Sequence, residues 1–437
     1  MIRPGGRALP ALALLGGLGL AGLAGSVAGC AGGGGGAPAT APGPPPTADA
    51  PQVTARQVMV TLRPAPPSLW AQTIRELEVN YRLRTVLAWS MASIGERCIV
   101  FDIAINRSAA QVVQQLHGDP RLSTVQVIQT FEALGGPAEP AAQAPAADRG
   151  YDRLQRGAQM LRLAAAHRMA TGRGVRVAVV DTGVDVGHPD LRNRIAKASN
   201  FVDRGEQTFT SDIHGTAVAG AIAADEKEGR IVSAAPEAEI FALKACWPQP
   251  PDSRQAVCNS YTLAKAIDFA IVEHAQVLNF SLAGPSDPLL ARLIRTALDR
   301  GIAVVAAVAP AGSRPSFPAA LAGVIGVVAS DLQGALRSPP PPGSWVAAPG
   351  VDILTTVPHG SYDFFSGSSL AAAEVSGIVA LLLERNPKLT PAQVREALVR
   401  SSTPIREQPG DSDPEVGMVD ACGALALIPG GGSCADR

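Results

Sequence analysis

The chain has 437 residues, of which 46% are hydrophobic and 17% charged. This length and composition permit a sizeable buried core and more than one domain. The formal net charge is −1 and the lysines and arginines do not gather into a block, so charge gives no support to nucleic-acid binding or to electrostatic membrane docking.

The N-terminus has the pattern of an export signal. Arg3 and Arg7 precede a stretch of Ala, Leu and Gly that ends in small residues directly before Cys30. This end resembles the bacterial lipobox, whose cysteine becomes the first residue of the mature protein and is acylated. An ordinary signal peptide or a spanning anchor is the alternative. We therefore expect a lipoprotein signal at 1–29, a Gly/Pro-rich tether at 30–51 and a membrane contact through lipid on Cys30.

Such a signal predicts a location in the bacterial cell envelope, facing the periplasm or the exterior, where cysteines can pair. Cys246 and Cys258 flank a Pro-rich loop, and Cys422 and Cys434 flank a Gly-rich one. We predict these two local disulfides, with Cys98 unpaired. Sequence alone does not fix the connectivity, so other pairings stay open.

Residues 52–134 have the pattern of a small α+β domain. Apolar alternation predicts strands, and helical spacing behind a capping serine predicts helices. In chain order we expect a strand at 57–62, a helix at 68–79, strands near 85–91 and at 98–105, a helix beginning after Ser108 and a strand at 125–131. This β-α-β-β-α-β order predicts a ferredoxin-like fold.

An Ala/Pro/Gly-rich linker at 135–149 leads to a larger domain at 150–425, and a short tail follows at 426–437. Continuous apolar runs predict strands at 175–180, 240–245, 277–282, 302–308 and 324–329, with helices expected at 215–224, 263–274, 289–300 and 369–385. Buried strands that alternate with helices favour a parallel sheet covered on both faces. We therefore predict a doubly wound α/β fold whose functional residues cluster at the carboxyl ends of the strands.

Asp181 and His214 stand at two such positions. Asp181 closes the first strand of the larger domain and precedes Thr-Gly. A carboxylate there is poorly solvated and needs partners, although a turn-capping aspartate is a common alternative. His214 comes directly before Gly-Thr-Ala-Val-Ala-Gly. These small residues allow a helix to begin at once and to approach the sheet closely.

Ser369 begins the apolar helix at 369–385 and follows Gly-Ser. A serine in that place commonly acts only as a helix N-cap. The same geometry also holds the hydroxyl where backbone N–H groups and the helix field can stabilise a developing oxyanion. Ser369 is therefore a candidate nucleophile.

The order Asp, His, Ser on a parallel α/β sheet resembles the subtilisin-like serine proteases. The resemblance covers about residues 150–425 and rests on the blocks VDTGVD at 180–185, HPDL at 188–191, HGTAVAG at 214–220, AAPEA at 234–238, NFSLAG at 279–284 and GSSLAA at 367–372. Beside it, the domain at 52–134 resembles that family's N-terminal propeptide, an intramolecular chaperone and inhibitor.

The resemblance implies a serine endopeptidase that acts on a peptide or protein. His214 would take the proton of the Ser369 hydroxyl, which attacks the peptide carbonyl, and Asp181 would orient the imidazole. The edge strand that pairs with extended substrate would consist of Ser281, Leu282, Ala283 and Gly284.

One part of the pattern is missing. The family's oxyanion hole uses an Asn in an Ala-Ala-Gly-Asn turn, where this chain has Ala306-Ala307-Val308-Ala309, and no Asn occurs between Asn279 and Asn386. Loss of such a donor lowers kcat about 10²–10³-fold, a magnitude known for subtilisin itself. The resemblance therefore implies a slow protease.

Two alternatives stay open, a pseudoprotease that binds extended peptides without cutting and a non-enzymatic envelope lipoprotein. No cofactor is expected. Calcium is common in the family, but no acidic cluster reproduces a known calcium loop, so the metal stays open. The sequence gives no indication of the oligomeric state.

Overall fold

The computed structural model describes residues 56–137, 155–202, 207–225, 231–249, 255–405 and 416–434. The predicted lipoprotein signal, the tether with Cys30 and most of the linker at 135–149 lie outside these ranges. Within them, no helix combines the length and the apolar character that crossing a membrane requires.

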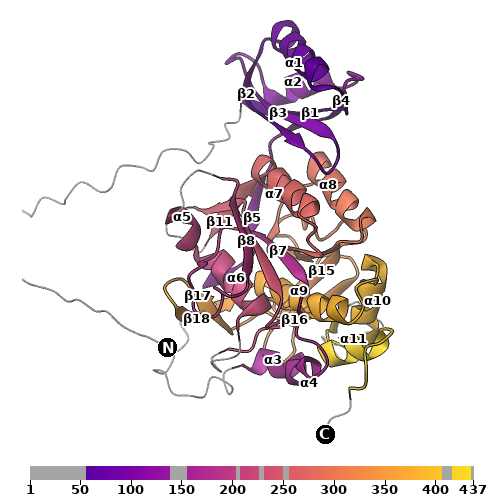
Figure 1. The fold of residues 1–437 in the computed structure, drawn as a ribbon. Helices are drawn as coiled ribbons and strands as arrows, with labels where there is room; N and C mark the ends of the chain where they lie inside the picture. The colour runs from indigo at the N-terminus through magenta and orange to yellow at the C-terminus, as the bar shows by residue number, and fades with distance from the viewer. Residues whose placement is uncertain are drawn as a thin grey trace, which may run out of the picture. The chain divides into compact units, whose positions relative to one another are not determined.

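The N-terminal domain is a four-stranded antiparallel sheet with two helices on one face (Figure 1). Its strand order is β2-β3-β1-β4, so the predicted ferredoxin-like fold is confirmed. The elements are β1 (Gln57–Leu62), α1 (Pro67–Tyr81), β2 (Leu83–Met91), β3 (Glu96–Ile103), α2 (Ala109–Leu116) and β4 (Leu122–Val127). Ser108 caps α2 as expected, in a reciprocal pair with Gln111.

This small sheet is buried on both faces. Val60 and Phe101 face α1 and α2 in one core. Met59 and Val100, which point the other way along the same strands, belong to a core shared with α7 (Ser260–Val272) and α8 (Pro288–Asp299) of the following domain. The second face of the sheet is therefore covered by residues that come later in the chain.

The larger domain is built on a sheet that has nine strands within the described ranges, in the order β19-β20-β16-β15-β14-β12-β7-β9-β8. Neighbouring strands pair in parallel except β19 with β20, and the predicted doubly wound fold is confirmed. The strands are β7 (Arg176–Asp181), β8 (Ile195–Asn200), β9 (Glu239–Lys244), β12 (Val277–Phe280), β14 (Ala303–Ala307), β15 (Ile325–Ser330), β16 (Trp345–Pro349), β19 (Thr403–Pro404) and β20 (Val416–Met418).

Helices cover both faces of this sheet because its strands present apolar side chains alternately to each (Figure 1). Val177 and Val179 pack in the core that contains α6 and α9, and Ala178 and Val180 pack in the core of α7 and α8. The remaining helices are α3 (Arg156–Met160), α4 (Leu163–His167), α5 (Gln207–Thr210), α6 (Ile213–Ala223), α9 (Ser368–Arg385), α10 (Pro391–Ser401) and α11 (Ala421–Leu427).

Residues 130–137 do not join the N-terminal sheet. The run expected as one strand at 125–131 ends at β4, and β5 (Thr130–Ala133) lies between two strands of the larger domain, in the order β10-β11-β5-β13. β6 (Gly136–Pro137) joins β17 (Ile353–Val357) and β18 (Ser361–Ser366). The other strands beside β5 are β10 (Cys246–Pro248), β11 (Ala256–Asn259) and β13 (Leu282–Ala283).

Two disulfides join the cysteine pairs named above, Cys246 to Cys258 and Cys422 to Cys434. Cys98 is a buried free thiol on β3, where burial raises its pKa well above the ordinary value, so it is a neutral side chain of the domain core.

Candidate active site

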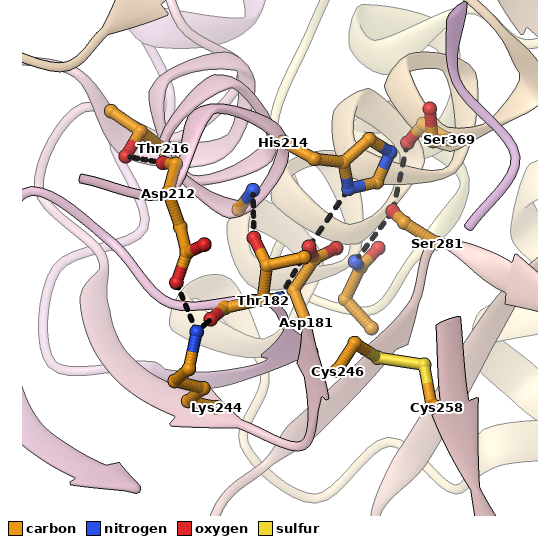
Figure 2. Close-up of polar contacts among 12 residues, drawn as sticks. Asp181, Thr182, Asp212, His214, Thr216, Lys244, Cys246, Cys258, Ser281 and Ser369 are labelled. Carbon is orange, nitrogen blue, oxygen red and sulfur yellow. Dashed lines mark hydrogen bonds and ion pairs between the residues drawn. A yellow bond between two sulfur atoms is a disulfide. The ribbon is translucent and has the colours of Figure 1, made fainter. Parts of the chain in front are cut away.

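Asp181 and His214 lie side by side at the carboxyl end of the sheet (Figure 2). Asp181 ends β7, and its Oδ1 atom lies 2.8 Å from Nδ1 of His214 and accepts the Thr182 backbone N–H at 2.7 Å. His214 occupies the first turn of α6. That turn comes so close to the sheet that a Cβ on Gly215 would lie 2.1 Å from the Gly183 carbonyl oxygen. The small residues after the histidine therefore bring the ring to the carboxylate.

A buried ion pair stabilises the positions of Asp181 and His214. Lys244 ends β9, beside Asp181 in the parallel register, and its Nζ atom binds the Asp212 carboxylate and the Thr182 carbonyl oxygen, the latter at 2.5 Å. Both charged side chains are at most 3% exposed. The pair joins the residue before the His214 turn to the residue after Asp181 (Figure 2), so one cation fixes both segments that carry the couple.

Ser369 is fully buried in the first turn of α9. Neither its Oγ atom nor Nε2 of His214 has a hydrogen-bond partner among the described residues. Each of these atoms lies 2.8 Å from the point that a Cβ on Gly135 would occupy. Their separation is therefore at most twice that distance, and the His214 ring faces the serine (Figure 2). The three predicted residues come together at one point.

A chain of buried polar side chains holds the serine's turn of α9. Ser281 donates its hydroxyl to the Ser369 carbonyl oxygen at 3.1 Å and accepts the Asn279 side-chain amide at 3.0 Å. Ser376, which lies further along α9, donates to the Asn279 side-chain oxygen at 2.9 Å. These bonds tie α9 to the end of β12, which fixes where the nucleophile can stand.

The cleft beside Ser369 contains the chain's own segment. β5 pairs with β13 at Leu282 and Ala283, and with β11 on its other side. The Leu134 N–H donates to the Ser281 carbonyl oxygen at 3.0 Å. All four residues predicted to bind substrate contact this segment. Ser281, Leu282 and Ala283 do so through backbone pairing, and a Cβ on Gly284 would come within 2.4 Å of the Phe131 ring.

The Leu134–Gly135 peptide lies beside Ser369 and His214. The Ser369 N–H donates to the Leu134 carbonyl oxygen at 3.1 Å, and Gly135 lies against Nε2 of His214 and Oγ of Ser369. A backbone N–H bonded to a peptide carbonyl beside a serine hydroxyl is the arrangement that stabilises a tetrahedral oxyanion.

The Leu134 side chain borders a pocket of about 210 Å³ that is lined mainly by apolar side chains and backbone. Val308 and Ala309 form part of its wall, where the family pattern has Gly and Asn, and no side-chain amide lines it. Val308 is not among the described residues with positive φ. The turn therefore has a backbone conformation that a β-branched residue can adopt.

The Cys246–Cys258 disulfide joins β10 to β11, the strand that borders β5. It therefore stabilises one wall of the cleft. Among the described residues, no group of three or more His, Cys, Asp or Glu side chains has the arrangement of a metal site.

Sequence reasoning missed the groups that support the site. Lys244 interrupts the apolar run at 240–245, and Asn279 and Ser376 interrupt other buried segments. A polar residue inside such a run signals a buried partner. The identity of the partner needs the fold, because each one comes from a distant part of the chain.

Comparisons with known proteins agree with this geometry. Residues 172–419 match the model of the subtilase family. The chain is 33% identical to an intracellular serine protease of Paenibacillus polymyxa over 276 residues, 59% of this chain and 82% of that protein. It is 35% identical to subtilisin BL of Lederbergia lenta over 246 residues, 55% of this chain and 88% of that protein.

The fold is also similar to that of fervidolysin from Fervidobacterium pennivorans, a keratinolytic enzyme related to subtilisin, with a TM-score of 0.70 and 23% identity. This likeness covers 86% of the present chain and 61% of fervidolysin, which is less than two thirds of that protein. With the family model matching more than half of its residues, the chain belongs to the subtilase family and is a subtilisin-like serine endopeptidase.

Proposed function

We propose that this protease uses Ser369 as nucleophile, His214 as general base and Asp181 as the residue that orients the imidazole, and that its first substrate is its own Leu134–Gly135 bond. The observation that carries the proposal is the position of this peptide. Its carbonyl oxygen accepts the Ser369 N–H, and its glycine lies against the histidine and the serine.

The reaction follows from these contacts. His214 takes the proton of the Ser369 hydroxyl, and Oγ bonds to the Leu134 carbonyl carbon. The oxyanion is stabilised by the Ser369 N–H. When the bond to the Gly135 nitrogen breaks, His214 returns the proton to the leaving amine. With His214 again as the base, water then hydrolyses the acyl-enzyme, which releases the N-terminal part of the chain with Leu134 as its C-terminal carboxylate.

The missing amide of the oxyanion turn supports a slow reaction. With Ala309 in the place of Asn, the Ser369 N–H is the one donor to the Leu134 carbonyl oxygen among the hydrogen bonds of the described residues. Removal of one such donor costs about 10²–10³ in kcat, as is known for subtilisin. The remaining groups still permit turnover, so we expect self-cleavage on a slow timescale.

The missing amide also favours one alternative, a pseudoprotease that binds an extended peptide without cutting it. Intact-mass measurement during expression and storage of the full chain separates the two. We expect wild type to yield a fragment that begins at Gly135, and Ser369→Ala to stay uncut. Ser344→Ala removes an exposed hydroxyl outside the site and serves as the matched control.

A fluorophosphonate probe gives the second arm of the experiment. Labelling that vanishes in Ser369→Ala, without cleavage at Leu134–Gly135, would overturn self-processing and leave the endopeptidase roles. Neither labelling nor cleavage in a folded protein would favour the peptide-binding alternative.

We also propose that the chain is held in the bacterial cell envelope by lipid on Cys30, so that self-cleavage at Leu134–Gly135 leaves the lipid on the N-terminal part. Support comes from the sequence, in which small residues lead directly into this cysteine and a Gly/Pro-rich tether follows. The mass of uncut Ser369→Ala protein extracted from membranes should exceed that of the chain from Cys30 by the acyl groups. Cys30→Ser should lose both this increment and the membrane fraction.

A further inference from the structure

The segment in the cleft is a peptide whose side chains the enzyme contacts individually, and the inference below rests on the proposed function. Counted back from the Leu134–Gly135 bond, Leu134 is the first residue, Ala133 the second, Glu132 the third and Phe131 the fourth. Successive side chains of a strand point to opposite faces. Phe131 is accordingly buried against Phe317, with ring centroids 6.1 Å apart, and Glu132 points outward.

Glu132 does not end in free solvent, because its carboxylate forms an ion pair with the Arg314 guanidinium. Within the described part of the chain, it is the only acidic side chain at ion-pair distance from Arg314. Glu132 would depart with the N-terminal domain after self-cleavage. The guanidinium would then remain beside the third position of the cleft without its carboxylate.

Arg314 belongs to the segment 308–318, which begins within the altered oxyanion turn at Val308 and Ala309. The backbone of Phe317, three residues later, bonds in both directions with Gly284, the last residue of the substrate edge strand. These bonds hold the segment against the edge that aligns the peptide. The position of Arg314 relative to the third residue is therefore set by the same backbone that sets the register.

We propose that Arg314 is a specificity-determining residue and that this protease prefers peptides with an acidic residue three positions before the cleaved bond. The side chains are 31% and 54% exposed, so water and salt weaken the pair. It tunes selectivity rather than permitting or forbidding cleavage. The self-cleavage sequence Phe-Glu-Ala-Leu meets this preference.

Internally quenched peptides spanning 131–137 test the proposal, with Glu, Gln or Lys at the third position and self-processed full-chain protein as the enzyme. We expect kcat/KM for the Glu peptide to exceed that for Gln about two- to fivefold and that for Lys about tenfold at low salt. The differences should shrink in 1 M salt. Arg314→Glu should reverse the order of Glu and Lys. Arg400→Glu makes the same charge change on α10 and should preserve the order.

Equal cleavage of the three peptides by wild type, or an order that Arg314→Glu leaves unchanged, would overturn this inference while the endopeptidase roles stand. Failure of the self-processed protein to cut any of the peptides would overturn this inference alone, whereas a full chain that never cuts its Leu134–Gly135 bond would overturn the proposed function and this inference with it.

Discussion

Two regions of the site differ in how firmly they are held. Around Asp181 and His214, buried charges come in pairs, with Lys244 bound to Asp212 and to the Thr182 carbonyl. The segment 308–318 is held by backbone bonds, by the hydroxyls of Ser313 and Ser316 and by the Arg314–Glu132 ion pair, and residues 310–313 are exposed. Loss of a partner in the first region strands a buried charge, whereas the ion pair of the second region is partly exposed to water. Val308 and Ala309, at the turn that has lost the family's Asn, are buried but carry no charge that needs a partner.

The largest expected effect is on stability, from Lys244→Met. It removes the cation that binds the buried Asp212 carboxylate, which should cost about 3–5 kcal/mol in the free energy of unfolding. Lys197→Met is the matched control, because Lys197 pairs with Glu273 where the side chains are 40% and 33% exposed, and should cost at most about 1 kcal/mol. Denaturant unfolding measures both. Equal losses would contradict the contrast between the regions.

A buried carboxylic acid gives a pH-dependent effect on stability. Glu374 lies one turn beyond Ser369 on α9, its Oε2 atom has no partner among the described residues, and burial raises its pKa from 4.5 to about 8. Native protein keeps this proton where unfolded protein has released it, so stability falls as the pH rises from about 4.5 to 8.

Glu374→Gln removes this dependence. Its stability advantage over wild type should grow by on the order of 3–5 kcal/mol between pH 5 and pH 9. Denaturant midpoints across that range provide the measurement, and Glu396→Gln, an exposed carboxylate on α10, should run parallel to wild type. A parallel curve for Glu374→Gln would show that the acid is ionised in a solvated or paired state.

The strand β11, at the wall of the cleft, is held by a disulfide. Cys246→Ser/Cys258→Ser and Cys422→Ser/Cys434→Ser each open a link across 12 residues and should each cost about 3 kcal/mol. Only the first pair borders the peptide, so only it should raise KM, by about two- to tenfold from loop ordering. Equal KM values for both double variants would contradict a role for β11 in binding.

The turn at 306–309 gives the smallest effect in free energy. Ala309→Asn restores an amide where the family pattern has one, and a partial rescue of kcat of about 10-fold is expected because Val308 still stands in the place of the family's Gly. Ala311→Asn, exposed in the same segment, should leave kcat unchanged. Initial rates on a cleaved peptide measure both. No gain for Ala309→Asn would mean that backbone shape limits the hole more than the missing amide does.

The sequence by itself determined the two folds and the three central residues. Asp181, His214 and Ser369 were predictable because each closes or begins a buried element within a short block. Such blocks carry local geometry, a strand end or a helix start, that needs no knowledge of the rest of the chain.

Only the tertiary structure decided which distant groups meet. From the sequence, the segment 130–137 is expected to be the end of one domain and the start of a linker. An extended segment that pairs with strands of another domain has no apolar periodicity that would reveal those partners. The Lys244–Asp212 and Arg314–Glu132 pairs were likewise hidden, since an ion pair is set by where two backbones pass in space. Burial and pairing depend on the assembled sheet, whereas capping and periodicity are written residue by residue.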